Sequence, residues 1–499
     1  MVYRNSQGDL EYASDGEGNR IPDFGYVGYK HGAALPTLPV VHTISPIAGD
    51  NTKHIQDAIN YVASRFSKDS QGFRGALLLN PGIYETDNVI YIPHDGVVVR
   101  GSGRGTDPLR DTIIKSTRTG VDEMVVRMGN SNSAPSSSWD RSVSGSVVSI
   151  TDSTVPIGQR TFHVSDSGPF RVGDLVVISQ KCNNAWFQAV DNGGTVDDPG
   201  WIERGFQRDI TFTRYVTQVS GDTITVDAPL YHRLNKNHGN LIMFKHNPGA
   251  PQETLYYNIG VENLRIDIVT AGGTDLQHTE AAIDIVGVID GWVRDVDMLH
   301  FSEEAIQVRK SLRITAQNCN AGPPIAPVEG GRMSGYAVSM GGQQVLFRDC
   351  RITGARHGFV LNGSTRSSGV VFLRGVLIDN IGTSEAGHQQ WSMGVLFDNC
   401  KVLSALPYTQ AFLLGNRGDW GTSHGWSAAN SVVWNTDTTA GGAIVVQKPP
   451  TAQNYAIGCS GTVNQHAPWP GPWGYTEGTG RGSTLKPPSL YEAQLAARN

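Results

Sequence analysis

The sequence is poor in cysteine, in long apolar runs and in excess positive charge. It has 5 cysteines in 499 residues, an odd number, widely spaced and without a Cys-x-x-Cys pair, so neither a disulfide framework nor a thiolate zinc site is indicated. No apolar run reaches the ~18 residues that a membrane-spanning helix needs. The net charge of -6 lacks the basic excess of a nucleic-acid-binding protein. These absences predict a protein with no nucleic-acid partner and no membrane partner.

Glycine and proline are abundant, with 59 and 25 residues, which suits a chain with many turns. Residues 50–66 predict one helix, since Asn51 or Thr52 can cap it and apolar residues follow at helical spacing. After it, short apolar segments alternate with Gly and Pro turns, beginning with Gly-Ala-Leu-Leu-Leu at residues 75–79. These segments follow one another too closely for helices to fit between them, which is typical of the coils of a solenoid.

A repeat is clearest in the second half of the chain. Phe347, Phe372 and Phe397 each end an apolar triplet, and the intervals between them are 25 residues. Cys350 and Cys400 follow at the same point of their coils. Stacked coils place equivalent residues about 4.8 Å apart, so we predict interior ladders of phenylalanine and of cysteine.

Two segments interrupt this rhythm. Residues 155–235 carry alternating strands around a polar, Trp-containing stretch and predict a small inserted β subdomain. Residues 461–499 are rich in Pro, Gly and Trp and end in a short helix, where Ser489 and Glu492 predict a capping box. We therefore expect a cap and first coils at 1–154, the insertion at 155–235, the main coils at 236–460 and a terminal wrap at 461–499, with both terminal helices covering ends of the solenoid.

Residues 75–105, GALLLNPGIYETDNVIYIPHDGVVVRGSGRG, resemble the opening coils of the pectate-lyase-like superfamily. The resemblance consists of the preceding helix, an apolar strand, the Pro-Gly-x-Tyr turn at 81–84 and the Val-x-Val-x-Gly-x-Gly segment at 97–103. It implies an all-β fold, a right-handed parallel β-helix, and an enzyme that acts on a polysaccharide. The chain lacks the arginine-centred signature of the pectate lyases and the paired-aspartate pattern of the polygalacturonases, so no catalytic residue is carried over from either.

The polar N-terminus shows no secretory h-region, which fits either a cytoplasmic protein or a mature chain whose signal has been removed. A polymeric carbohydrate substrate favours the second alternative, a secreted protein. We expect a monomer or a small homo-oligomer. Among relatives, the nearest general resemblance is to β-helix lyases that act on alginate and other uronates.

Three histidines, His357, His388 and His424, lie just ahead of apolar segments on successive coils. Coil stacking predicts that they project into one outer groove, where imidazole suits proton abstraction near neutral pH. We expect His357 or His388 to act as the general base and His424 to bind substrate. Tryptophans near these histidines predict stacking on sugar rings; they are Trp391, Trp420 and Trp426.

Removing a proton next to a uronate carboxylate also requires that this carboxylate be neutralised. Arg356 and Arg332 are the predicted catalytic cations, and Lys310 is a predicted substrate-binding cation. Ca²⁺ is an alternative means of neutralisation, and no residues are assigned to a metal.

Two alternatives to a β-eliminating lyase remain open. A glycoside hydrolase needs two carboxylates, for which Glu303 or Glu304 with Glu329 are the candidates, and strand alternation predicts that only one of the adjacent pair enters the groove. A non-catalytic glycan-binding β-helix, of the tailspike or adhesin type, is the other. In the insertion, a second wall of the groove is predicted from Lys181, Trp186, Trp201 and Arg208, with Trp186 as a substrate-binding residue.

Overall fold

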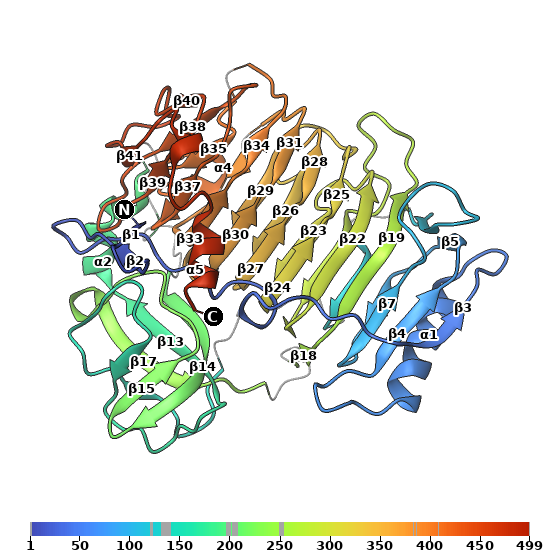
Figure 1. Cartoon of the computed structure of the whole chain (residues 1–499), viewed down its shortest axis with the longest axis horizontal. Coiled ribbons are helices and arrows are strands. Elements are labelled where there is room, and N and C mark those ends of the chain that lie inside the picture. Colours follow the sequence, from blue (N-terminus) through green and yellow to red (C-terminus); the bar gives the residue numbers. More distant parts are fainter. Residues whose placement is uncertain are drawn as a thin grey trace.

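The chain forms a right-handed parallel β-helix with one antiparallel insertion, which confirms the predicted fold class (Figure 1). The computed structural model describes residues 2–119, 123–130, 141–195, 201, 208–248, 254–382, 384–385, 387–407 and 409–498. Within that part of the chain, no helix is both long enough and apolar enough to cross a membrane. Strands of successive coils pair in parallel, as in β24–β27–β30–β33, where Val345 aligns with Val370 and Val370 with Val395.

Three stacks of parallel strands make the walls of the solenoid. The largest comprises β3 (Val40–Ile44), β4 (Gly75–Leu79), β5 (Gly82–Thr86), β7 (Val97–Arg100), β8 (Thr112–Ser116), β18 (Tyr256–Tyr257), β19 (Gly260–Ile268), β21 (Val288–Ile289), β22 (Trp292–Leu299), β24 (Leu312–Gln317), β25 (Asn320–Ala321), β27 (Gln343–Arg348), β28 (Arg351–Thr353), β30 (Ser368–Leu373), β31 (Val376–Ile378), β33 (Ser392–Asp398), β34 (Lys401–Val402), β36 (Ala428–Ala429), β37 (Val432–Trp434), β39 (Tyr455–Ile457) and β41 (Tyr475–Glu477). The second comprises β6 (Ile90–Ile92), β9 (Met124–Gly129), β20 (Ala281–Val286), β23 (Ile306–Arg309), β26 (Ser334–Ser339) and β29 (His357–Asn362). The third comprises β32 (Ser384–Glu385), β35 (Phe412–Leu414), β38 (Ala443–Val446) and β40 (Thr462–Val463).

The largest sheet turns a corner at a column of residues in the left-handed region. Asn and Asp enter this region more readily than other residues with a Cβ, and they fill most of the column. Its members are Asn263, Asp295, Asn318, Asp349, Arg374, Asn399 and Asn435. Asp295 and Asp349 are therefore corner residues of this sheet.

The interior is built from ladders of like side chains. The rings of Phe347 and Phe372 lie 5.1 Å apart with planes inclined by only 8°, and Phe397 continues the stack at 5.2 Å. Cys350 and Cys400 are fully buried in the same core. The phenylalanine ladder is confirmed, and the two cysteines occupy the same interior position of coils two steps apart, with Gly375 between them.

The two terminal helices play different parts. Helix α1 (Thr52–Arg65) lies at one end of the solenoid (Figure 1) and buries Ile55, Ile59 and Val62 against the first coils, as predicted for a cap. Helix α5 (Leu490–Ala496) instead crosses the side of the solenoid near β30 and β33, so its predicted place over an end is wrong.

A buried carboxylate holds α5 in that position. Asp398 Oδ2 accepts hydrogen bonds from Ser489 Oγ at 2.7 Å and from Tyr491 N at 2.8 Å. Ser489 caps the helix by accepting from Glu492 N, as predicted, whereas the Glu492 carboxylate pairs with Arg374. The side of the solenoid therefore offers polar partners that the sequence pattern did not reveal.

The insertion is antiparallel and wider than the predicted 155–235. Its strands are β10 (Val148–Ser149), β11 (Thr154–Val155), β12 (Thr161–His163), β13 (Leu175–Cys182), β14 (Ile210–Ser220), β15 (Thr223–Val226), β16 (Leu234–Asn235) and β17 (Gly239–Lys245). The outer strands extend it because β10 and β17 pair with each other and β17 pairs with β13. A short helix, α2 (Asn184–Ala189), follows β13, and a hairpin of β1 (Val2–Arg4) and β2 (Leu10–Tyr12) precedes the solenoid.

Candidate functional site

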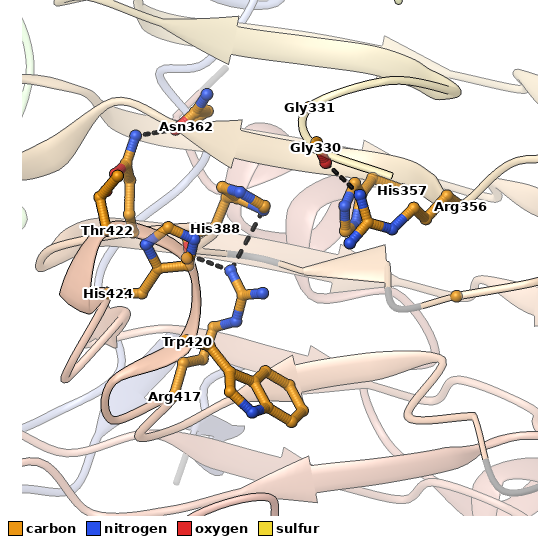
Figure 2. Close-up of a pocket in the computed structure, with 13 residues that line it drawn as sticks. Gly330, Gly331, Arg356, His357, Asn362, His388, Arg417, Trp420, Thr422 and His424 are labelled. Atoms are coloured by element: carbon orange, nitrogen blue, oxygen red, sulfur yellow. Dashed lines mark hydrogen bonds between the residues drawn. The ribbon is translucent and has the colours of Figure 1, made fainter. Parts of the chain in front are cut away.

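A cavity of about 660 Å³ opens beside the start of β29, which is the last strand of the second stack (Figure 2). A volume of this size is typical of a small-molecule or sugar-binding site. Its walls come from four successive coils, the last of which includes helix α4 (Trp420–Ser423). The lining residues with functional side chains are Arg356, His357, Asn362, His388, Gln389, Arg417, Trp420, Thr422 and His424.

The three predicted histidines stand in one row in this cavity. The ring centroids of His357 and His388 are 4.8 Å apart, and those of His388 and His424 are 4.7 Å apart. The backbones of His357 and His388 lie at different coil positions, since His357 begins β29 whereas His388 N donates to the carbonyl of Leu361 near the end of that strand at 2.8 Å. The predicted convergence of the three histidines in one cavity is confirmed.

Arg417 fixes the orientation of the central histidine. Its Nη1 lies 3.2 Å from His388 Nδ1, and the same atom donates to the backbone carbonyl of His388 (Figure 2). A guanidinium can only donate, so His388 Nδ1 accepts, and the neutral ring carries its proton on Nε2. The guanidinium of Arg417 also lies over the ring of Trp420, 5.6 Å from its centroid.

Short polar contacts hold the loops around the cavity. Gln389 Nε2 donates to Asn362 Oδ1 at 2.6 Å, and Thr422 Oγ1 donates to Gln389 Oε1 at 3.3 Å. Arg356 donates to the backbone carbonyl of Gly330 across the mouth. These bonds tie four successive coils together, so the cavity is formed before any ligand binds.

A smaller cavity of about 160 Å³ adjoins the first and shares His357, Asn362 and His388 with it. Glu303 and Glu304 both line this second cavity, so the prediction that only one of them faces the groove is wrong. They lie in the turn before β23 rather than within the strand, and strand alternation does not govern them.

Burial raises the pKa of Glu304 to about 8, and the nearby carboxylates of Glu303 and Asp284 add to the effect. Gln307 Nε2 donates to Glu304 Oε1 at 3.1 Å. Asp284 is itself buried behind the groove and is clamped between Arg127 and Arg309, with Nε–O distances of 3.0 and 3.1 Å. At neutral pH, Glu304 is therefore mostly the neutral acid, which can donate as well as accept a hydrogen bond.

Three of the tryptophans predicted to bind substrate are buried, and those predictions are wrong. Trp391 and Trp186 are fully buried and meet edge to face, 5.7 Å apart, and Trp426 is only 3% exposed. Trp391 Nε1 donates to His232 Nε2 at 3.0 Å. Trp420 alone among the predicted tryptophans is substantially exposed and lines the cavity.

The insertion supports the histidine loops from behind, so the predicted second wall of the groove is also wrong. Trp201 is buried, and its Nε1 donates to the carbonyl of Ser423, next to His424, at 3.2 Å. Arg208 is buried and donates to Gln390, two residues from His388. Lys181 pairs with Asp209 at 2.8 Å and lines neither cavity.

The remaining predicted charges fall outside both cavities. Arg332 pairs with Glu329 at 3.0 Å on an exposed turn, where the Glu329 side chain is 66% exposed. Lys310 is buried after β23. The assignments of Arg332, Glu329 and Lys310 are therefore wrong, because each lies in a turn whose direction the coil pattern does not specify.

The sequence analysis did not identify several residues of the site. Arg417 lies three residues after β35, one coil beyond His388. Its place on the coil next to His388 is the feature of the sequence from which it could have been predicted. Asn362 ends β29, and Gln389 follows His388 directly. Among the described residues, no group of three or more His, Cys, Asp or Glu side chains is arranged to hold a metal ion.

No protein-family model matches the sequence, and no curated protein matches it by sequence. Among solved structures, the chain is similar to the tailspike protein gp49 of Pseudomonas phage LKA1, with 13% identity, a TM-score of 0.44, and coverage of 83% of this chain and 64% of the tailspike. The chain thus spans just under two thirds of that protein.

It is also similar to the polygalacturonase of Erwinia carotovora subsp. carotovora, with 9% identity, a TM-score of 0.43, and coverage of 89% and 96%. A third similar structure is the alginate lyase of Paenibacillus sp. str. FPU-7, with 8% identity, a TM-score of 0.39, and coverage of 89% and 99%. None of these likenesses assigns a substrate or a reaction to this chain.

Proposed function

We propose that the chain is a secreted polysaccharide lyase that cleaves a uronate-containing polymer by β-elimination. The observation that carries the proposal is the meeting of three imidazoles and two guanidiniums in one preformed cavity. Imidazoles exchange protons near neutral pH, and guanidiniums neutralise carboxylates, which are the two requirements of this reaction.

In this reaction, His357 removes the proton on the carbon next to the uronate carboxylate. Arg356 and Arg417 face that carboxylate and stabilise the charge that develops on it. The electron pair then forms a carbon–carbon double bond as the bond to the glycosidic oxygen breaks. The imidazolium of His357 then delivers that proton to the departing oxygen, and His388, whose neutral ring carries its proton on Nε2, donates a hydrogen bond to the same oxygen.

The other residues of the cavity bind and orient the sugar. Trp420 presents an exposed ring at the mouth, beside Arg417. His424 continues the row of histidines and hydrogen-bonds to the polymer. No step is assigned to Ca²⁺ in this scheme.

The proposal is tested with His357→Ala and His388→Ala, assayed on acidic polysaccharides by the ultraviolet absorbance of the new double bond. Loss of a general acid or base lowers turnover by about 10²–10⁴-fold. His163→Ala is the matched control, because this exposed histidine pairs with Asp152 on the insertion. Full activity of a folded His357→Ala variant contradicts the assignment.

A glycoside hydrolase is the second candidate, because the raised pKa of Glu304 suits a general acid at the same groove. New reducing ends without ultraviolet absorbance would identify this reaction. Binding of polysaccharide without any cleavage would identify the third alternative, a glycan-binding β-helix.

A further inference from the structure

The smaller cavity next to the histidine cavity is lined by acidic side chains, whereas the histidine cavity is lined by basic ones. Its lining carries the carboxyl groups of Glu303 and Glu304, and no Lys or Arg is among its described lining residues. The two cavities adjoin through His357 and His388, so a polymer that occupies one continues directly into the other.

The register of the strands sets the distance between the two cavities. Ile306 aligns with Tyr336, and Ser334 aligns with His357, so Glu304, Ser334 and His357 begin three consecutive coils at the same position. Two coil steps of about 4.8 Å separate Glu304 from His357. The acidic cavity is also much smaller, about 160 against 660 Å³, and is the size of a site for one sugar unit.

A buried hydroxyl in the acidic cavity gives independent evidence of a ligand. Ser339 is only 4% exposed and lines the cavity, yet its Oγ has no hydrogen-bond partner anywhere in the described part of the chain. An unsatisfied buried hydroxyl is costly, and a sugar hydroxyl would satisfy it. Gln307 and Asn362 add further neutral hydrogen-bonding groups on the same wall.

From this geometry we infer that the polymer alternates in charge, with a uronate in the histidine cavity and a sugar without a carboxylate in the cavity of Glu303, Glu304 and Ser339. A neighbouring sugar with hydroxyl or amino hydrogens can donate to the two glutamates. A second uronate there would place its carboxylate against Glu303, which like charge disfavours. This inference rests on the proposed function, since it names the substrate class of the same site.

The test compares the binding of two polymers to the whole protein by affinity electrophoresis. The probes are polygalacturonate, in which every sugar carries a carboxylate, and hyaluronan, in which a uronate alternates with an uncharged amino sugar derivative. We expect hyaluronan to bind at least about tenfold more tightly. The double variant Glu303→Gln/Glu304→Gln should lose this preference by gaining affinity for polygalacturonate, and the single variant Glu303→Gln should do so in part.

Glu329→Gln serves as the control, because that glutamate is exposed and outside both cavities. Equal or tighter binding of polygalacturonate, binding of neither polymer, or an unchanged preference in the folded variants overturns the inference. Binding is measured without turnover, so an absence of ultraviolet-absorbing product would refute the lyase reaction while leaving the charge preference standing.

Discussion

Replacing Glu304 with Gln should stabilise the protein at alkaline pH and leave its stability unchanged in acid. Glu304 is held beside Glu303 and Asp284 in a partly buried cavity, and its pKa is raised from 4.5 to about 8. Below pH 4.5 the carboxyl group is protonated in both folded and unfolded chains. As the pH rises from 4.5 to 8, the unfolded chain releases this proton first, so the free energy of unfolding falls.

The size of this effect follows from the difference between the pKa of Glu304 in the folded and in the unfolded chain. At 1.36 kcal/mol per pH unit, a pKa of about 8 instead of 4.5 costs at most about 5 kcal/mol above pH 8. Since the carboxyl group borders an open cavity, solvent screens part of the cost, and we expect about 2–3 kcal/mol. A chain of 499 residues unfolds with an entropy of about 1 kcal/mol/K, so the melting temperature should rise by about 2–3 °C.

Calorimetry of the wild type and the Glu304→Gln variant at pH 5, 7 and 9 measures this difference. Gln keeps an oxygen that can accept the hydrogen bond from Gln307, so the contact at 3.1 Å should survive the change. Glu329→Gln is the control and should shift the melting temperature little at any pH, since its ion pair with Arg332 is exposed. A shift for Glu304→Gln that is the same at pH 5 and pH 9 would refute the argument, because the carboxyl group would then be ionised throughout.

Three further perturbations probe the framework of the site. Asp284→Asn leaves two guanidiniums buried without their carboxylate and should destabilise the fold by about 3–5 kcal/mol in urea unfolding; a change below 1 kcal/mol would contradict the clamp. Trp420→Ala should weaken polysaccharide binding by about 1–2 kcal/mol and leave the melting temperature unchanged, because this side chain is exposed. Trp391→Ala should lower the free energy of unfolding by about 3–5 kcal/mol, because this side chain is fully buried. Loss of stability for Trp420→Ala and loss of binding alone for Trp391→Ala would contradict these two assignments. Phe372→Ala interrupts the phenylalanine stack and should cost about 3–5 kcal/mol in the same unfolding assay, and a much smaller loss would mean that the stack does not hold the coils in register.

Position within a coil explains the predictions about the interior. Phe347, Phe372 and Phe397 are aligned in register and stack at 5.1 and 5.2 Å, because repetition in the sequence becomes proximity in space when coils stack. The rings of His357, His388 and His424 also meet, as predicted, but loop packing contributes to this, since His357 begins β29 and His388 pairs with Leu361 near the end of that strand.

Turns and the insertion obey no such rule. Trp391 and Trp426 lie near the histidines along the chain, yet both are buried because Trp186 and Trp201 of the insertion pack behind the same loops. Arg332 is close in sequence to Arg356 but pairs with Glu329 on an outer turn.

By itself, the sequence determined the β-helix and its interior ladders, since both depend on a periodic pattern of side chains, and it placed the three histidines on neighbouring coils. Only the tertiary structure decided that Arg417 orients His388, that Glu303 and Glu304 share a cavity, and that the insertion supports the site from behind. These features join segments whose loops differ in length and direction, and their contacts are set by how the loops pack rather than by any repeat.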